Sequence, residues 1–213
     1  MKKQIELNAP HQPKTFAFKD AAAVKDILGR YPEERARSAI MPLLDLAQRQ
    51  MGEEGAKANP PFGGWIPRAA MDEIARIVGE PPIKVYEVAT FYSMYNIEPV
   101  GKYLVQMCTT TPCMLRGSDG IVGACQSRLG IHAGETTADG KFTLMEVECL
   151  GACVNAPMVQ INDDFYEDLT PERMTEILNL LADDKAVPVG SQTGRLNSQA
   201  DGGGTTLKVA KSG

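Results

Sequence analysis

Four of the five cysteines in this 213-residue chain lie in two close pairs. Cys108 and Cys113 enclose Thr-Thr-Thr-Pro, and Cys149 and Cys153 enclose Leu-Gly-Ala. The thiolate is the form of cysteine that binds metals, and two local pairs can bring four thiolates to one inorganic centre. The spacing of these cysteines is therefore the main indication of function in the sequence.

Three kinds of centre are compatible with these pairs. A 2Fe-2S cluster takes four thiolates, two for each iron, and two local pairs supply that division. Most structural zinc sites use C-x2-C knuckles, and thioredoxin-type disulfide chemistry uses C-x-x-C, but neither pair has that spacing. The spacing favours an iron–sulfur cluster and leaves a four-cysteine zinc module and a disulfide site as alternatives.

The remaining candidate side chains do not add to this centre. Cys125 lies on a predicted helix face with Val122 and Leu129, which is typical of a small buried hydrophobic residue. His11 and His132 lie in loop-like stretches without neighbouring ligands. No glycine-rich loop has the context of a phosphate-binding or Rossmann motif, so we predict that the chain binds no nucleotide itself. We assign no catalytic residue.

Composition narrows the class of partner. The net charge of -5 and the pI near 5.2 argue against nucleic acid as a partner, because binding the phosphate backbone needs clustered Lys and Arg. No apolar run reaches 18 residues, so we expect a soluble chain without direct membrane insertion. The start of the chain lacks a secretory or transit signal, and five cysteines without one indicate a reducing compartment.

The sequence predicts a helical N-terminal part after an arm of residues 1–18. Within residues 19–98, apolar side chains recur at helical spacing in four segments: 20–28, 32–52, 68–78 and 82–92. Pro42 is expected to kink or divide the second of these. A helix-turn-helix is a minor alternative that the acidic charge disfavours. The aromatic residues near the end, Tyr86, Phe91, Tyr92 and Tyr95, are interpreted as core or interface packing.

The pattern changes after Pro99 to Gly101, and residues 99–184 read as β, α, β, β, α. The expected elements are strands at 103–107, 142–148 and 159–161, a return pairing of Phe165 and Tyr166, and helices at 114–129 and from Thr170. This order predicts a small layered α/β domain. Both cysteine pairs follow predicted strands, so they are expected to meet at the carboxyl edge of the sheet. Residues 185–213 are predicted to be a flexible tail that is either disordered or draped over a partner.

Three stretches together resemble the small 2Fe-2S subunit of the NADH-oxidising module of respiratory complex I. They are V-Y-E-V-A-T-F-Y-S-M-Y at 85–95, C-T-T-T-P-C at 108–113, and E-C-L-G-A-C-V-N-A-P-M-V-Q-I-N at 148–162. The resemblance covers residues 19–183 and implies an α+β fold, a helical bundle followed by a thioredoxin-like ferredoxin domain. It implies one 2Fe-2S cluster with the ligands Cys108, Cys113, Cys149 and Cys153, and it raises iron–sulfur above zinc. A cis bond before Pro157 is a further expectation.

The same resemblance implies a function and partners. The chain would be a one-electron carrier that exchanges electrons with FMN on a larger flavoprotein subunit, which also holds the NADH site and a 4Fe-4S cluster. NADH oxidation is then not expected from this chain alone, and residues 85–95 are the candidate contact. The expected location is cytoplasmic, peripheral on the inner face of a bacterial plasma membrane, or the matrix side in a mitochondrion. The equivalent diaphorase subunit of an NAD-linked hydrogenase or formate dehydrogenase is the alternative.

Overall fold

The computed structural model describes residues 11–200 and 203. The first ten residues of the predicted arm, and positions 201, 202 and 204–213 of the predicted tail, lie outside the described residues. The chain divides into two compact units, residues 1–102 and residues 103–213. Within the described ranges, no helix qualifies as a membrane span.

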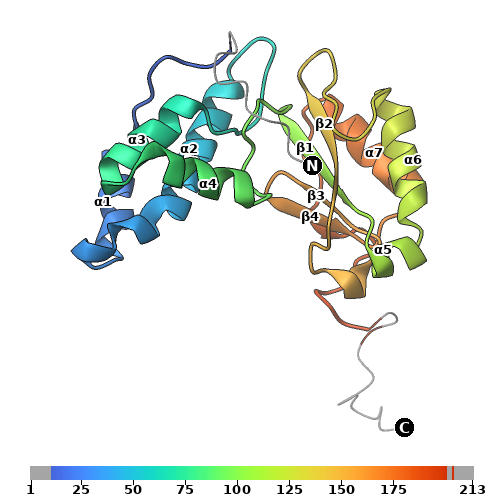
Figure 1. The fold of residues 1–213 in the computed structure, drawn as a ribbon. Helices are drawn as coiled ribbons and strands as arrows, with labels where there is room; N and C mark the ends of the chain where they lie inside the picture. Colours follow the sequence, from blue (N-terminus) through green and yellow to red (C-terminus); the bar gives the residue numbers. More distant parts are fainter. Residues whose placement is uncertain (1–10, 201–202, 204–213) are drawn as a thin grey trace, which may run out of the picture. The chain divides into compact units, whose positions relative to one another are not determined.

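The first unit is helical (Figure 1). Its elements are α1 (Ala21–Gly29), the 3-10 helix η1 (Glu33–Ala39), α2 (Ile40–Gly55), α3 (Arg68–Val78) and α4 (Pro82–Phe91). Local chemistry sets their limits: the Asp20 carboxylate accepts a hydrogen bond from the Ala23 N–H at 2.8 Å at the start of α1. Gly79, at a φ of +72°, ends α3 in the left-handed conformation that glycine adopts without strain.

The helical segment predicted from Pro32 to Gly52 is divided, but at Ile40 and not at Pro42, and it ends later than expected. The 3-10 helix gives way to α2 at Ile40, so Pro42 lies in the first turn, where its missing N–H leaves no hydrogen bond unmade. Gly52 does not end α2, which continues to Gly55. A Cβ at position 52 would lie 3.2 Å from the backbone nitrogen of Gly64, so this glycine allows a close approach of two backbones.

The apolar stripe predicted for α2 forms the centre of the first unit's core. The helices α3 and α4 pack against α2. The four residues of the stripe are all buried: Ile40, Leu43, Leu44 and Ala47. The predicted packing role of the aromatic residues applies to Tyr95, which is 2% exposed and donates a hydrogen bond to the Met41 carbonyl at 2.9 Å. Phe91 differs, because its side chain is 81% exposed.

The second unit is a five-stranded mixed sheet in the order β2-β1-β3-β4-β5, with helices packed on it (Figure 1). The strands are β1 (Tyr103–Cys108), β2 (Phe142–Val147), β3 (Val159–Ile161), β4 (Asp164–Glu167) and β5 (Gly190–Ser191). β1 is parallel to β2 and antiparallel to β3, β3 is antiparallel to β4, and β4 is parallel to β5. The predicted pairing of Phe165 and Tyr166 with the preceding strand is confirmed.

Helices α6 (Ser118–Leu129) and α7 (Pro171–Ala182) pack against each other, and α6 also packs on β1 and β2. The predicted cap of α7 is confirmed, since the Thr170 hydroxyl accepts from the Arg173 N–H at 3.2 Å. The single helix predicted at 114–129 is wrong. Gly117, at a φ of +94°, separates a short α5 (Thr111–Leu115) from α6.

Residues 185–200 do not match the predicted flexible tail. Gly190 and Ser191 form β5 on the edge of the sheet, and Arg195 makes an ion pair with Asp168 in which both side chains are largely buried. Backbone hydrogen bonds and polar side chains, not a buried apolar face, attach this segment to the sheet. An apolar periodicity is therefore not needed here, and the sequence shows none. The part of the predicted tail that the structure describes therefore belongs to the second unit.

Candidate metal centre

The two cysteine pairs lie at one edge of the sheet because β1 and β2 are parallel and in register. Cys108 is the last residue of β1 and is paired with Val147, the last residue of β2. Cys149 follows two residues later. Cys113 lies in α5, and Cys153 begins the short 3-10 helix η2 (Cys153–Asn155). This is the arrangement at the carboxyl edge that the sequence predicted.

The four cysteines are arranged as two pairs and do not surround a single point. The sulfur atoms of Cys149 and Cys153 are 3.4 Å apart, close to the roughly 3.8 Å that two bonds of about 2.3 Å at a tetrahedral metal ion give. Within the described residues, no group of three or more His, Cys, Asp or Glu side chains is placed to hold one metal ion. Pairs of thiolates fit a centre with two metal ions better than the single zinc ion of the alternative.

The first pair is buried in a small apolar cluster with Ala156 and Met158. Burial raises the pKa of Cys108, but hydrogen bonds from the hydroxyl and backbone N–H of Thr110 and from the Leu150 N–H outweigh burial, so its pKa is lowered. The Thr110 Oγ1 lies 3.3 Å from the Cys108 sulfur. Burial, and then the neighbouring Cys108, raise the pKa of Cys113 to about 11.

The second pair lies on an exposed loop. The Gly151 N–H is the main cause that lowers the pKa of Cys149, and a hydrogen bond with Cys153 also lowers it. The same contact raises the pKa of Cys153. In each pair one thiolate is favoured and its neighbour is disfavoured: burial is the main cause at Cys113, the hydrogen bond with Cys149 is the main cause at Cys153, and repulsion between the two charges adds to both. A bound cation would allow all four thiols to lose their protons together.

Hydroxyl and backbone N–H groups next to the cysteines contact their sulfur atoms. Thr110, Leu150 and Gly151 contact the sulfur atoms. The Thr109 hydroxyl does not donate to a cysteine sulfur, because it donates to the Glu146 carboxylate at 2.7 Å. The Met158 N–H, which contacts Cys113, was missed because a backbone donor leaves no trace in side-chain type.

The remaining sequence candidates lie elsewhere. Cys125 is fully buried in the core of the second unit, where burial raises its pKa to about 12, in agreement with the prediction of a small buried hydrophobic residue. In the first unit, the His11 Nε2 lies 2.9 Å from a Glu98 oxygen. The backbone N–H of His132 binds the Glu135 carboxylate. The peptide bond between Ala156 and Pro157 is cis, as the sequence led us to expect.

Comparisons with known proteins bear on this site. The profile of the thioredoxin-like 2Fe-2S ferredoxins matches residues 24–182. The chain is 50% identical to NADH dehydrogenase (ubiquinone) flavoprotein 2, mitochondrial, of Dictyostelium discoideum, across 96% of this chain and 78% of the relative. It is 54% identical to a subunit of the NADH-quinone oxidoreductase of Rickettsia bellii, across 80% of this chain and 95% of the relative.

Among solved structures, a chain of NAD+-reducing NiFe-hydrogenase in the H2-reduced state is similar to this one. The two align with a TM-score of 0.52 and 18% sequence identity, over 67% of this chain and 24% of the hydrogenase chain. At this identity the likeness concerns the fold alone.

Proposed function

Because this chain belongs to the thioredoxin-like 2Fe-2S ferredoxin family, we propose that it is the one-electron carrier subunit of the NADH-oxidising module of an NADH:quinone oxidoreductase, respiratory complex I. The two relatives that are half identical to it across most of their lengths carry names of that enzyme. The family match also assigns one 2Fe-2S cluster to the chain. The observation that carries the proposal is the presence of two thiol pairs, one on each of two adjoining parallel strand ends.

The proposed ligands are Cys108 and Cys113 for one iron, and Cys149 and Cys153 for the other. When bound, such a cluster accepts and releases single electrons. The chain contributes the thiolates, the hydroxyl of Thr110 and the backbone N–H groups that offset negative charge on the sulfur atoms. Apolar packing keeps water from the first pair, while the exposed second pair lies at the surface, where a redox partner can approach.

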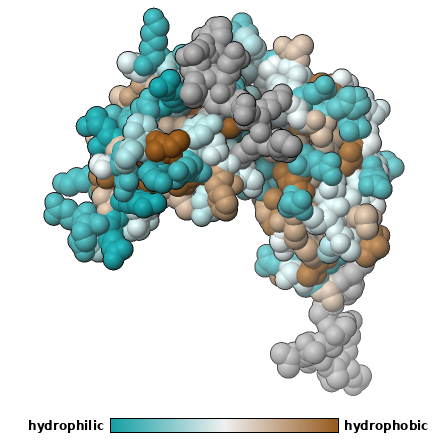
Figure 2. Space-filling view, in the orientation of Figure 1, coloured by the Kyte–Doolittle hydropathy of each residue, from teal (hydrophilic) through white to brown (hydrophobic). Residues whose placement is uncertain are grey.

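The proposed partner is a larger flavoprotein subunit that binds FMN and NADH. In this proposal the chain alone does not oxidise NADH. The first unit offers a contact surface at the end of α4, within the predicted contact 85–95, where apolar side chains are exposed: Phe91 at 81%, Tyr92 at 39% and Met94 at 52%. Aromatic residues and Met are enriched in protein interfaces. Figure 2 shows apolar side chains among hydrophilic ones on the surface of the chain.

The proposed location follows from this enzyme. The chain is peripheral, on the inner face of the plasma membrane in a bacterium or on the matrix side in a mitochondrion. The alternative, a diaphorase subunit of an NAD-linked hydrogenase or formate dehydrogenase, has the support of a likeness in fold only. The relatives at 50% and 54% identity favour complex I.

The cluster is tested by producing the chain with iron and sulfide available. Metal and sulfide analysis, visible absorption and low-temperature EPR before and after dithionite are the measurements. We expect two irons and two sulfides per chain and an EPR signal that appears on reduction by one electron. A colourless protein with one zinc per chain would contradict the proposed function. Co-purification with the complex I flavoprotein of the same organism, in preference to a hydrogenase flavoprotein, tests the choice of enzyme.

A further inference from the structure

Residues 190–199, which we name the C-terminal clasp, are attached to the sheet beside the second cysteine pair. The attachment begins at β5, where Gly190 pairs with Tyr166 and Ser191 with Glu167 of β4. The Gln192 N–H then donates to the Glu167 carbonyl at 3.0 Å. β5 is only two residues long, so the rest of the clasp depends on other contacts.

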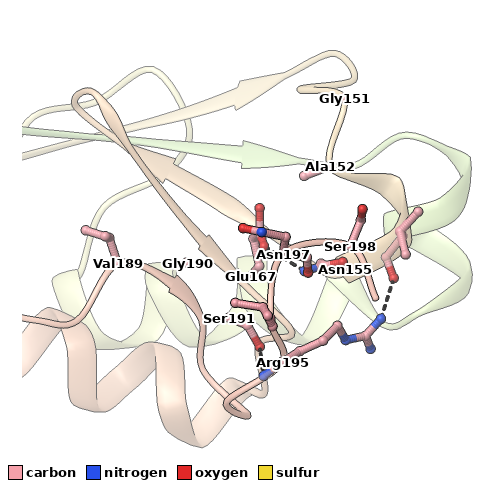
Figure 3. Close-up of a pocket in the computed structure, with 12 residues that line it drawn as sticks. Gly151, Ala152, Asn155, Glu167, Val189, Gly190, Ser191, Arg195, Asn197 and Ser198 are labelled. Atoms are coloured by element: carbon pink, nitrogen blue, oxygen red, sulfur yellow. Dashed lines mark hydrogen bonds between the residues drawn. The ribbon is translucent and has the colours of Figure 1, made fainter. Parts of the chain in front are cut away.

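Those contacts are made to the turn that begins at Cys153 (Figure 3). The Arg195 guanidinium donates through Nη1 to the carbonyl of Val154 at 3.1 Å. From the turn, Asn155 donates through Nδ2 to the carbonyl of Asn197 at 2.8 Å. Val154 follows Cys153 directly, so the clasp binds the backbone next to a proposed cluster ligand.

A buried ion pair anchors the guanidinium. Arg195 Nη2 lies 2.9 Å from Asp168 Oδ1, and the two side chains are only 11% and 6% exposed. Asp168 also accepts a hydrogen bond from the Ser191 hydroxyl at 2.6 Å, and its backbone N–H donates to the Asn155 carbonyl at 2.8 Å. The pair therefore joins β4, the clasp and the cysteine turn in one network. A buried pair is weak evidence for stability, but it fixes geometry where both partners are also hydrogen-bonded.

The clasp and the turn enclose a cavity of about 510 Å³ (Figure 3). Its lining includes Gly151 and Ala152, which lie between the two cysteines of the exposed pair. Asn155 Oδ1 and Arg195 Nε are buried, and neither has a hydrogen-bond partner among the described residues. The cavity is thus lined on one side by the cysteine loop and the turn after it, and on the other side by the clasp.

We propose that the C-terminal clasp is a positioning element for the exposed half of the cluster site, with Arg195 as its central positioning residue. The exposed loop needs such support, because the helical turn at Cys153 is three residues long and has no side-chain cap at its start. Groups that orient metal ligands from outside are worth about 10- to 100-fold in metal affinity or activity. The proposal rests on the ligand assignment for Cys149 and Cys153.

The experiment compares two truncations of the full chain. Ending the chain after residue 188 removes the clasp, and ending it after residue 200 keeps the clasp and removes only residues 201–213. Iron release to a chelator is measured on the cluster-loaded protein, and backbone hydrogen exchange of residues 152–156 is measured on the cluster-free protein. We expect roughly tenfold faster iron release and faster exchange for the shorter chain. The chain that ends after residue 200 should match the full chain in both iron release and hydrogen exchange.

Point variants keep the test decisive if the shorter chain does not fold. Arg195→Gln should speed both iron release and exchange, and Arg195→Lys should restore them only in part, since an ammonium lacks the fork that reaches Asp168 and Val154 together. Leu196→Ala is the matched control, because this side chain of the clasp is 69% exposed and should change neither measurement.

Unchanged hydrogen exchange and unchanged iron release in Arg195→Gln would contradict the proposal that the clasp positions the exposed half of the site. If the full chain bound no cluster, the proposed function would fail by itself. Hydrogen exchange in the cluster-free chain would still decide whether the clasp holds the turn.

Discussion

The two cysteine pairs of the proposed cluster site are held by different physical means. Cys108 and Cys113 are buried among apolar side chains, Cys108 at the end of the interior strand β1 and Cys113 in α5. Cys149 and Cys153 are exposed, and the turn at Cys153 is bound to the C-terminal clasp through the Arg195 guanidinium and the Asn197 carbonyl. One half of the site is therefore part of the core, while the other half depends on polar contacts from a distant segment.

This difference indicates a division of labour between the halves. A buried ligand pair keeps its geometry as long as the domain is folded, because the core around it is close-packed. An exposed pair can approach a redox partner, but it requires separate restraints to keep its geometry. Chemical probes and substitutions should therefore affect the two halves unequally. A substitution that removes a contact to a cluster ligand should change cluster stability or potential more than a similar substitution nearby that removes no such contact.

The largest contrast is expected in thiol chemistry of the cluster-free protein. Cys149 is exposed and its pKa is lowered, whereas Cys113 is buried and its pKa is raised to about 11. A pKa two units above the ordinary value leaves about 100-fold less thiolate at neutral pH, and the thiolate is the form that reacts. Iodoacetamide should therefore modify Cys149 at least about 100-fold faster than Cys113 at pH 7, with mass spectrometry as the readout.

Both alkylation rates should rise with pH, because the thiolate reacts, but the pH range of the rise should differ between the two thiols. Cys149 should reach its maximal alkylation rate at a lower pH than an ordinary cysteine, while the rate at Cys113 should continue to rise through pH 10. Cys125, with a pKa of about 12, is the internal reference for a thiol that reacts only after unfolding. Equal rates at Cys113 and Cys149 in the folded chain would break the comparison.

Serine substitution in the cluster-loaded protein should show the next largest contrast. In Cys113→Ser, the Met158 N–H can still reach the new oxygen, but the O–H donor faces an apolar site, and a buried donor without a partner costs about 1–3 kcal/mol. In Cys153→Ser, the hydroxyl is solvated. We expect Cys113→Ser to retain roughly tenfold less iron than Cys153→Ser under the same chelator, as measured by iron analysis. Similar retention would mean that the two halves are equivalent.

Gly151→Ala should weaken only the exposed half. Gly151 has a φ of +89° and a Cβ there would meet no atom within 4 Å, so the cost is conformational, about 1–2 kcal/mol. Its N–H is the main cause that lowers the pKa of Cys149, so the loop should lose this contact and the cluster should be released several-fold faster. Gly123→Ala, also without a neighbour within 4 Å but in α6, should leave iron release unchanged and stabilise the helix by up to about 1 kcal/mol in thermal unfolding.

The sequence allowed the buried half of the site to be predicted because short-range patterns specify it. Apolar runs predict β1 and β2, and the cysteines come directly after them, so the meeting of the two pairs at one edge results from a parallel sheet. The cap at Thr170 and the hairpin of β3 and β4 likewise depend on neighbouring residues. The strands, the cap and the hairpin require no knowledge of distant contacts, whereas the pairing of β1 with β2 joins segments that are far apart in the sequence.

The clasp could not be predicted for the opposite reason. Arg195 and Asp168 are distant in sequence, and nothing in the residue types around Arg195 indicates that its guanidinium is buried. A segment rich in Gly, Ser and Thr reads as flexible whether or not its backbone pairs with a strand edge. Residue types likewise do not indicate that the Met158 N–H contacts Cys113. Nor do they indicate that Gly52 lies against the backbone of Gly64.

The smallest effect is expected at Thr110, whose hydroxyl lies 3.3 Å from the Cys108 sulfur of the buried pair and also contacts Cys149. In Thr110→Val the shape is kept while the hydroxyl near the Cys108 sulfur is lost. A hydrogen bond to a ligand sulfur stabilises the reduced state, which carries one more negative charge, so its loss should lower the reduction potential. A hydrogen bond worth about 0.5–1.5 kcal/mol sets the shift at no more than roughly 60 mV. Thr109→Val is the matched control, because that hydroxyl donates to Glu146, and redox titration followed by EPR should find its potential unchanged. If both variants shifted the potential equally, the effect would come from polarity at this strand end and not from the contact with Cys108.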